Sequence, residues 1–309
     1  MSFTDQMQVF ARVAELSSFT QAAMALGLPK ASVSTAVQQL ESRLGTRLLH
    51  RTTRRVQLTQ DGQVFYERCK DLLADVDEIE TLFQQPGHAP LAGRVRIDMS
   101  TRVALRAVLP RLPELLAEHP QLEIELSSTD RRVDLVREGF DCVLRAGPVV
   151  DAGLVARPLG RMRMVNCASP AYLAAHGVPR RLEDLGAHRL VCYATTLGGR
   201  TAGFEYVHEG PPRETREWPM RGVVTVNNAD AYEAACLAGL GLVQAPLAGL
   251  RDALADGRLV QVLPDWPAPP LPFNLLYANR RHLSKRVRVV MDWLAAVAAD
   301  YLAGADAAD

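Results

Sequence analysis

A run of small hydroxyl and amide side chains has the composition of a surface that hydrogen-bonds to base edges in DNA. Its polar members are Lys30, Ser32, Thr35, Gln38 and Gln39. The apolar residues of the same segment recur at spacings of four, three and four: Val33, Val37, Leu40 and Leu44. A helix with this pattern buries the apolar stripe and leaves an uncharged, hydrogen-bonding face that suits a major groove. The alternative is a small helical hairpin with no nucleic-acid role.

The segment just before this helix predicts a shorter helix that packs closely against it. Ala22, Ala23 and Leu26 recur at helical spacing, and the two alanines permit a close approach of the two backbones. Gly27 ends this helix, and Pro29 permits a new start. Two helices joined in this way form a helix-turn-helix.

Arginines cluster immediately after the second helix. Arg47, Arg51, Arg54 and Arg55 surround a Thr-Thr turn that is followed by Val56 and Leu58, the alternation of a small β-wing. Residues 1–60 carry seven arginine or lysine residues against three acidic ones, whereas the whole chain has a net charge of zero. This concentration of positive charge at one end indicates a phosphate-binding module.

The stretch from Phe19 to Thr59 resembles the winged helix-turn-helix of LysR-type transcriptional regulators. The resemblance depends on F19-T-Q-A-A, L26-G-L, V33-S-x-x-V-x-x-L-E41, L44-G, L48-L-x-R51 and L58-T, and it extends more loosely over nearly the whole chain. The sequence departs from the family pattern at Lys30, Ala31 and Thr35, where the family often has Gln-Pro early in the recognition helix and a basic residue after the second serine. The residues expected to contact DNA are Thr20, Lys30, Ala31, Ser32, Ser34, Thr35, Gln38, Arg51, Arg54 and Arg55.

Residues 61 to about 85 predict one long helix, with Asp61 as its cap. Its apolar positions repeat at 3.5 residues, the period of a seam between two helices: Phe65, Cys69, Leu72, Val76, Ile79 and Phe83. We therefore expect this helix to pair two subunits and to set the spacing of two recognition helices. The alternative is an amphipathic helix packed within its own chain. Residues 86–90, Pro-Gly-His-Ala-Pro, indicate a hinge.

From Arg94 onward short apolar strands alternate with helices, which is typical of α/β sheets. The predicted strands are Val95–Met99, Leu122–Leu126, Cys142–Arg145, Leu154–Arg157, Met164–Ala168, Leu190–Tyr193, Val223–Val226, Leu242–Gln244, Leu259–Leu263 and Phe273–Ala278. The predicted helices are Leu105–Glu118, Val133–Glu138, Ala229–Leu237, Leu247–Ala255 and Lys285–Ala299. This pattern alone leaves open whether there are one or two sheets.

The family resemblance implies two subdomains of periplasmic-binding-protein type. The expected fold class is therefore α/β with an all-α N-terminal part: a winged helix-turn-helix, a long linker helix, and a two-subdomain, periplasmic-binding-protein-like effector domain. The boundaries are 1–60 for the DNA-binding domain and 61–87 for the linker helix. Subdomain I takes residues 91–161 plus 268–309, and subdomain II takes residues 162–267.

Ligands of such sheets bind beyond the carboxyl ends of the strands, where several polar residues of this sequence are expected to converge. The candidate effector-binding residues are Ser100, Thr101, Arg102, Ser128, Thr129, Arg145, Ala146, Thr195, Thr196 and Asn227. Arg102 would add a positive charge to an anion site at a helix start. The alternatives are that Ser100, Thr101 and Asn228 are ordinary helix caps, that Arg102 is exposed to solvent, and that Arg145 pairs with Asp141 or Asp130.

Other function classes fit the sequence less well. Common catalytic motifs such as Gly-x-Ser-x-Gly, the Gly-Lys-Ser/Thr phosphate loop and His-Glu-x-x-His do not occur, and the seven histidines lie far apart. The five cysteines are scattered without a Cys-x-x-Cys spacing, which argues against a disulfide framework or a zinc site. Redox sensing by a cysteine pair is an alternative within the same architecture, and a solute-binding protein without a DNA role is an alternative of another class.

The sequence thus predicts a DNA-binding regulator controlled by a small organic effector, not an enzyme, with no metal or other cofactor. Its expected partners are double-stranded DNA, RNA polymerase, a second copy of the chain in a dimer of dimers, and the effector. The sequence has no run of eighteen apolar residues, and residues 1–10 lack the plan of a signal peptide. A membrane partner is therefore not expected, and the predicted location is the cytoplasm.

Overall fold

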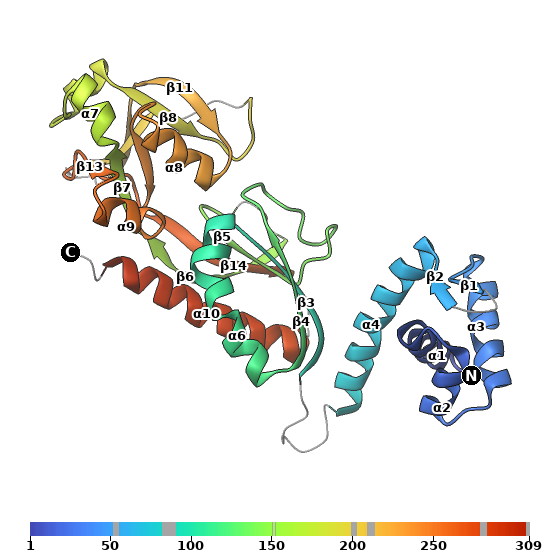
Figure 1. Ribbon diagram of the computed structural model, residues 1–309. Coiled ribbons are helices and arrows are strands. Elements are labelled where there is room, and N and C mark those ends of the chain that lie inside the picture. Colours follow the sequence, from blue (N-terminus) through green and yellow to red (C-terminus); the bar gives the residue numbers. More distant parts are fainter. Residues whose placement is uncertain are drawn as a thin grey trace. The chain divides into compact units, whose positions relative to one another are not determined.

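The protein is described by a computed structural model that covers residues 1–51, 56–81, 91–149, 151, 153–198, 203–208, 214–278 and 283–306 (Figure 1). The chain forms two compact units. The N-terminal unit comprises Met1–Arg94, His119–Glu123 and Ser284–Arg286, and the C-terminal unit comprises Val95–Glu118, Ile124–Leu283 and Val287–Asp309.

The N-terminal unit contains the predicted helix-turn-helix and a two-stranded wing. Its elements are α1(Phe3–Leu16), α2(Phe19–Leu26), α3(Lys30–Leu44), β1(Leu49–Arg51), β2(Val56–Leu58) and α4(Gln60–Thr81). The side chain of Ser18 accepts a hydrogen bond from the Gln21 N–H and so caps α2. Gly27 then ends α2 at a φ of 63°, which a residue with a side chain adopts only at a cost.

A single apolar core holds these elements together. Phe10 and Val13 of α1 and Val37 and Leu40 of α3 are fully buried in it. Ala22 and Ala23 are buried there too, as their predicted role in close helix packing requires. Glu41 joins α3 to the wing, because its Oε1 accepts hydrogen bonds from the backbone N–H groups of Leu48 and Leu49 at 2.9 and 3.1 Å.

The start of α4 differs in detail from the prediction. Thr59, and not Asp61, caps the helix: its Oγ1 accepts from the Gly62 N–H at 2.8 Å and donates to the Arg47 carbonyl at 2.7 Å. Asp61 instead accepts a hydrogen bond from the Thr46 hydroxyl at 2.7 Å. A side chain at Gly62 is impossible here, since its Cβ would lie 1.9 Å from the Leu48 carbonyl oxygen.

The first half of the predicted dimer seam packs within its own chain, which corrects part of that prediction. Cys69 is buried in the core of the N-terminal unit, and the Phe65 ring lies 5.5 Å from the Phe10 ring. Leu72 is 46% exposed and Val76 is half-buried, so these two positions of the seam stay a prediction. Phe83 and the side chain of Ile79, like the predicted hinge 86–90, lie outside the described residues.

The C-terminal unit has two lobes, each built on its own sheet or sheets (Figure 1). The first lobe contains a five-stranded sheet in the order β4-β3-β5-β14-β6. Its elements are β3(Ala92–Met99), α5(Thr101–Val103), the π-helical turn η1(Ala104–Val108), α6(Leu109–Glu118), β4(Gln121–Ser128), β5(Cys142–Ala146), β6(Leu154–Met162), β14(Leu271–Ala278) and α10(Lys285–Asp306). The strand β3 runs parallel to β5, whereas β14 runs antiparallel to both β5 and β6.

The second lobe is inserted between β6 and β14. Its sheets have the orders β12-β7-β13, β11-β8 and β10-β9, and a parallel bridge from Leu190 to Leu242 adjoins the first two. Its elements are β7(Met164–Ala168), α7(Pro170–His176), η2(Leu182–Ala187), β8(Arg189–Tyr193), β9(Phe204–His208), β10(Glu214–Trp218), β11(Arg221–Val226), α8(Ala229–Leu237), β12(Val243–Pro246), α9(Leu247–Ala255) and β13(Val260–Gln261).

Most predicted strands and helices of this unit are present, but the helix predicted at residues 133–138 is wrong. That segment forms turns, in which the Asp134 side chain accepts from the Arg137 N–H at 3.0 Å and Gly139 ends the turn at a φ of 72°. The prediction also missed the antiparallel pair β9 and β10, whose exposed second strand shows no alternation of burial. Within the described residues, no helix is both long enough and apolar enough to cross a membrane.

Candidate functional site

The outward face of α3 is the first candidate site. Lys30, Ala31, Thr35 and Gln38 are exposed along one side of the helix, and Ser32 and Ser34 are half-buried beside them. Gln39 is engaged within the unit, since its Oε1 accepts from the Gln6 Nε2 at 3.1 Å. Thr20, at the start of α2, is exposed as well. The exposed face therefore offers one cation and short hydrogen-bonding groups, with no carboxylate among these predicted residues.

The wing carries the other predicted DNA contacts. Arg54, Arg55 and the side chain of Arg51 lie outside the described residues, so their role stays a prediction. Arg47, just before the wing, is exposed, and Arg43 at the end of α3 lies over the Phe3 ring at 4.3 Å. These two side chains extend the positive charge along the same end of the unit.

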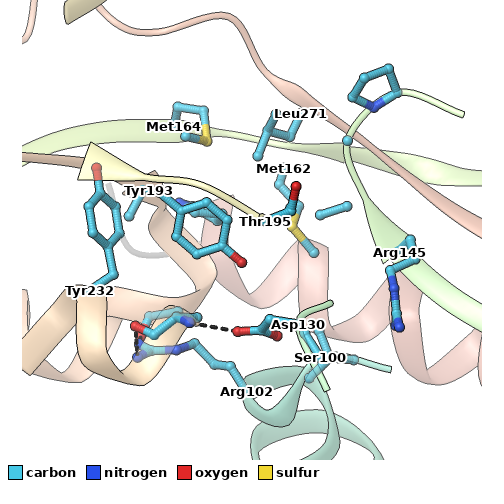
Figure 2. A pocket seen from close by; sticks show the side chains of 18 of the residues that line it. Ser100, Arg102, Asp130, Arg145, Met162, Met164, Tyr193, Thr195, Tyr232 and Leu271 are labelled. Carbon is cyan, nitrogen blue, oxygen red and sulfur yellow. Dashed lines mark hydrogen bonds between the residues drawn. The ribbon is translucent and has the colours of Figure 1, made fainter. Parts of the chain in front are cut away.

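The second candidate site is a cavity of about 780 Å³ in the C-terminal unit, lined by residues of both lobes. Most of its lining is aliphatic or aromatic, with Met162 and Met164 near the crossing between the lobes and Tyr193 and Tyr232 from the second lobe (Figure 2). A cavity of this size with a few convergent polar groups is typical of a site for a small organic ligand.

The cavity brings together half of the predicted effector residues. Ser100, Arg102, Arg145, Ala146 and Thr195 line it. The other five, all within the described part of the chain, lie outside its lining: Thr101, Ser128, Thr129, Thr196 and Asn227. Their role as ligands stays a prediction.

Two of these five side chains are used in the packing of the first lobe. The Thr101 hydroxyl donates to the Ser128 carbonyl at 3.2 Å, and the Thr129 hydroxyl donates to the Asp98 Oδ2 at 3.2 Å. Asn228 caps α8, because its side chain accepts from the Ala231 N–H at 2.8 Å. Asn227 and Thr196 are exposed.

Arg102 joins the two lobes. Its Nη1 donates to Glu233 Oε2 and to the Gly249 carbonyl, both at 2.6 Å, and its Nη2 donates to the Ala229 carbonyl at 2.9 Å and to Asp230 Oδ1 at 3.0 Å. The side chain is only 10% exposed, so the alternative of a solvent-exposed arginine is wrong. Gly249 permits this approach, because a Cβ there would lie 2.7 Å from Arg102 Cδ. Both terminal nitrogens thus already have protein acceptors.

Arg145 also has an internal partner. Its Nη2 forms an ion pair with Asp98, which is completely buried, and donates to the Arg131 carbonyl at 3.1 Å. The alternative of an internal ion pair is therefore confirmed for Arg145, but the partner is Asp98 and not Asp141 or Asp130. Asp98 and Arg145 lie on the adjacent parallel strands β3 and β5. The order of the strands brings them together, although they are far apart in the sequence.

Asp130, Tyr193, Tyr232 and Glu233 also line the cavity, although they were not among the predicted effector residues. Asp130 Oδ2 accepts from the Ala229 N–H, the first residue of α8, at 2.6 Å (Figure 2). Burial, and next the charge of Asp130, raises the pKa of Tyr193 to about 12. Asp130 lies two residues after the end of β4, and Tyr193 is the last residue of β8, so a position at the carboxyl end of a strand is the signal that could have found them.

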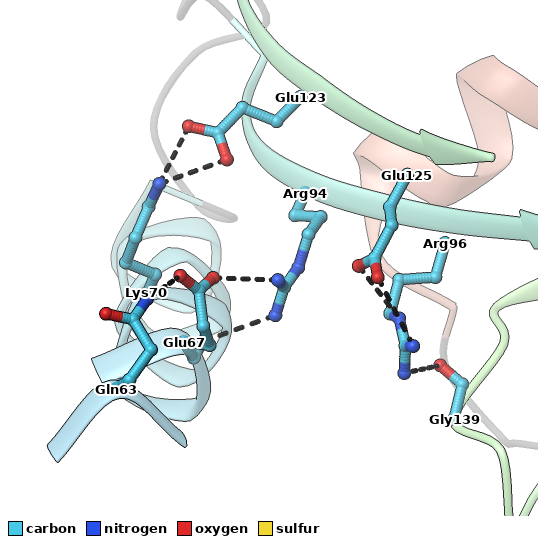
Figure 3. Close-up of polar contacts among 8 residues, drawn as sticks. All are labelled: Gln63, Glu67, Lys70, Arg94, Arg96, Glu123, Glu125 and Gly139. Carbon is cyan, nitrogen blue, oxygen red and sulfur yellow. Dashed lines mark hydrogen bonds and ion pairs between the residues drawn. The ribbon is translucent and has the colours of Figure 1, made fainter. Parts of the chain in front are cut away.

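Polar contacts tie the linker helix α4 to the beginning of the first-lobe sheet (Figure 3). Within the N-terminal unit, Glu67 accepts from Arg94 at 2.7 Å and Lys70 donates to Glu123 at 2.7 and 3.0 Å. Arg94 and Glu123 belong to β3 and β4, two strands that continue into the C-terminal unit.

All five cysteines are buried and none forms a disulfide. Burial raises the pKa of the Cys69, Cys167 and Cys236 thiols to about 12 and also raises that of Cys142. Because the thiolate is the reactive form, this environment does not favour the redox-sensing alternative.

A winged helix-turn-helix and a two-lobed α/β domain with an internal cavity, joined in one chain, define a DNA-binding regulator that carries a small-molecule binding domain. The family description "Bacterial regulatory helix-turn-helix protein, lysR family" matches residues 4–63, and "LysR substrate binding domain" matches residues 88–299. The chain belongs to the LysR family of transcriptional regulators.

Relatives of similar sequence and of known structure agree with this assignment. The chain is 47% identical over 296 residues to the HTH-type transcriptional regulator YhjC of Escherichia coli, covering 96% of this chain and 98% of the relative. It is 36% identical to the HTH-type transcriptional repressor PA14_22550 of Pseudomonas aeruginosa, covering 93% and 90%. Among solved structures it is similar to CrgA, a LysR-type regulator from Neisseria meningitidis, with 28% identity, a TM-score of 0.59 and coverage of 95% and 98%.

Proposed function

We propose that the cavity between the lobes binds a small organic effector and that this binding changes how the protein occupies its promoter. The observation that carries the proposal is the pair of cross-lobe contacts at the cavity, made by Arg102 and Asp130 with α8 and α9. A ligand seated beside these contacts changes the relative free energy of closed and open lobes. It regulates only through such a difference in affinity between two arrangements.

At the other end of the chain, the proposed DNA contact is the exposed face of α3 in a major groove. Arg51, Arg54 and Arg55 of the wing would bind phosphates or the minor groove. A homodimer, arranged further as a dimer of dimers, would place recognition helices in successive major grooves. RNA polymerase is the proposed partner at activated promoters, and the cytoplasm, where bacterial DNA lies, is the proposed location. The protein acts in this scheme as a regulator and not as an enzyme.

The signal would pass between the cavity and the DNA-binding domain through β3, β4 and α4. Two ion pairs support this route: Glu67 of α4 pairs with Arg94, and Lys70 of α4 pairs with Glu123. A shift of the first-lobe sheet would move β3 and β4, the strands that carry Arg94 and Glu123. Whether the outcome is activation or repression depends on the promoter geometry.

The test of the DNA contact is a gel-shift titration of the full-length protein with its own promoter region at low salt. Thr35→Glu places a carboxylate on the proposed base-reading face, and we expect promoter affinity to fall by about a hundredfold, as an unfavourable contact at a base edge costs about 1–3 kcal/mol and like-charge repulsion adds to it. Gln8→Glu is the matched control, because Gln8 is exposed on α1 and receives the same charge change. Equal losses of promoter affinity in the two variants would mean that α3 does not contact the DNA.

The test of the linker helix is the oligomeric state. Val76→Glu introduces a charge at the predicted seam, and we expect light scattering to report monomers or much weaker dimers. An intact dimer in this variant would assign the subunit contact to another surface.

A further inference from the structure

The two carboxylate oxygens of Asp130 have different environments. Oδ2 accepts the N–H of Ala229 at the start of α8, at 2.6 Å. Oδ1 is buried, yet among the described residues it has no hydrogen-bond partner. A buried carboxylate oxygen without a donor is unfavourable, so a ligand that displaces the side chains covering this oxygen and supplies a donor gains affinity there.

The groups around this oxygen suit a bound donor. The Tyr193 hydroxyl points toward Asp130 across the cavity, and Ser100 lies beside the carboxylate (Figure 2). Tyr193 is neutral at ordinary pH, since burial raises its pKa to about 12, so its hydroxyl can donate and accept at the same time. The Ser100 side chain makes no capping hydrogen bond at the start of α5 and is open to a ligand in this respect.

The charges along the cavity favour a donor over an anion. Five carboxylate side chains line it against three arginines: Asp130, Asp134, Asp151, Glu205, Glu233, Arg102, Arg132 and Arg145. Arg102 and Arg145 are already paired with Glu233, Asp230 and Asp98, so only the exposed Arg132 remains without an ion-pair partner among the described lining residues. An anionic ligand would therefore meet like charge at Asp130, and the terminal nitrogens of Arg102 and Arg145 already donate to protein acceptors; of the Arg102 guanidinium nitrogens only the buried Nε has no acceptor among the described residues.

We propose that the effector is a mainly apolar molecule that carries a protonated amine, and that it donates a hydrogen bond from this group to Asp130 Oδ1 while its body lies against Met162, Met164 and Leu271. This inference rests on the proposed function of the cavity and names the chemical class that the cavity selects. Asp130 is then a specificity-determining residue that also links the ligand to the second lobe, because its other oxygen accepts a hydrogen bond from the first residue of α8.

Three probes of one shape separate the chemical classes: phenethylamine, phenethyl alcohol and phenylpropionate. Their affinities for the full-length protein are measured by calorimetry, and competition among them shows whether they share one site. We expect phenethylamine to bind about tenfold or more tightly than phenylpropionate, because a charge-assisted hydrogen bond replaces like-charge repulsion.

Asp130→Asn tests the residue itself. Asparagine keeps an oxygen that accepts from the Ala229 N–H, and its NH₂ group takes the place of the unpaired oxygen. The position then favours a hydrogen-bond acceptor on the ligand instead of a donor. We expect this variant to lose about tenfold of its phenethylamine affinity, the usual size of one charge-assisted hydrogen bond, and to bind phenylpropionate more tightly than the wild type. Asp151→Asn is the matched control. It removes the same charge from the lining at a carboxylate that accepts from the Gly153 N–H, and it should change either affinity by less than about threefold.

Three outcomes would overturn the inference: equal affinities in the wild type and Asp130→Asn, a wild-type preference for phenylpropionate, or no binding of any probe at millimolar concentration. An unchanged unfolding transition in tryptophan fluorescence shows that Asp130→Asn is folded. Promoter binding without any probe serves as a separate readout. If the wild type failed to bind its promoter, the proposed regulatory function would be contradicted, whereas the proposed preference for an amine ligand would not be affected.

Discussion

The exposed face of α3 and the wall of the cavity contain similar polar side chains but use them in opposite ways. On α3, Lys30, Thr35 and Gln38 are exposed, and within the described part of the chain Lys30 has no ion-pair partner. In the cavity, Arg102 and Arg145 are largely buried, and each is paired with a carboxylate. A cation that the protein leaves unpaired is available to another molecule, whereas one with several internal acceptors holds the fold.

This contrast changes which residues of the cavity are expected to recognise a ligand. The arginines near strand ends first suggested an anion site. Because the terminal nitrogens of both arginines already donate to protein acceptors, recognition falls on groups with an unused hydrogen-bonding position, such as Asp130. Residue type alone therefore predicts the location of the site better than its chemistry.

Arg102→Ala is the sharpest way to break the comparison. The change leaves Glu233 and two backbone carbonyls without a donor in a buried position, and we expect the free energy of unfolding of the C-terminal unit to fall by about 3–5 kcal/mol. All three tryptophans, Trp218, Trp266 and Trp293, lie in this unit, so urea unfolding followed by tryptophan fluorescence reports on it selectively.

Arg106→Ala is the control for this experiment. Arg106 lies four residues further along the same helical stretch and pairs with Asp252, but both side chains are about half exposed. Its loss should cost below about 1 kcal/mol, as for other exposed ion pairs. Similar losses in the two variants would mean that burial does not distinguish the two arginines.

Lys30→Ala tests the opposite half of the comparison. We expect about tenfold weaker promoter binding and a decrease of about one in the slope of log affinity against log salt, because one phosphate contact is lost. Stability should change by less than about 0.5 kcal/mol, since an exposed side chain without an internal partner is removed. A loss of stability with an unchanged salt slope would contradict the assignment of Lys30 to the DNA interface.

Sequence patterns predicted the helix-turn-helix well because its information is local. The apolar stripe and the break at Gly27 depend on residues a few positions apart. Val33, Val37 and Leu40 are buried as expected, whereas Leu44, the last residue of the predicted stripe and of α3, is 38% exposed. The same holds for most strands of the C-terminal unit, where short apolar runs mark the sheet interior.

Contacts over long sequence distances were harder to predict. The pairs Arg102–Glu233 and Arg145–Asp98 join residues 131 and 47 positions apart, and only the strand order and the approach of the lobes bring them together. For a related reason the first two positions of the seam assigned to α4 pack within their own chain, because a 3.5-residue repeat does not say what it packs against. Phe65 and Cys69 face their own core, which a repeat of this length allows.

A smaller effect is expected at an ion pair whose exposure to solvent lies between that of the buried Arg102 and that of the exposed Lys30. Glu67 is about one-third exposed and pairs with Arg94 at 2.7 Å, so Glu67→Gln should weaken the attachment of β3 to α4 by about 0.5–1 kcal/mol. Hydrogen exchange of α4 around Glu67 and of the peptide that spans residues 92–99 should then be about two- to fivefold faster. Glu125→Gln removes a similar pair with Arg96 that does not involve α4, so it should leave the exchange of α4 unchanged. Equal effects of both variants on α4 would remove Glu67 from the proposed route.

The smallest effect concerns His188, a buried titratable group that forms no ion pair within the described part of the chain. Burial, and next the charge of His176, lowers the pKa of His188 below 6.5, although Asp184 opposes the shift. As pH falls below 6.5, the unfolded chain therefore binds this proton before the folded protein does. The contribution of His188 to stability is complete above pH 6.5 and is lost as pH falls through the lower folded pKa.

His188→Gln should remove that part of the pH dependence. Urea unfolding by tryptophan fluorescence at a series of pH values would show a flatter decline below pH 6.5 in this variant than in the wild type. His208→Gln, a change on β9 of the same lobe, is the control and should keep the wild-type slope. If His188→Gln and the wild type declined in parallel, the buried imidazole would not be the group whose protonation opposes folding, and the contrast between paired and unpaired buried groups would have to be drawn from Arg102 alone.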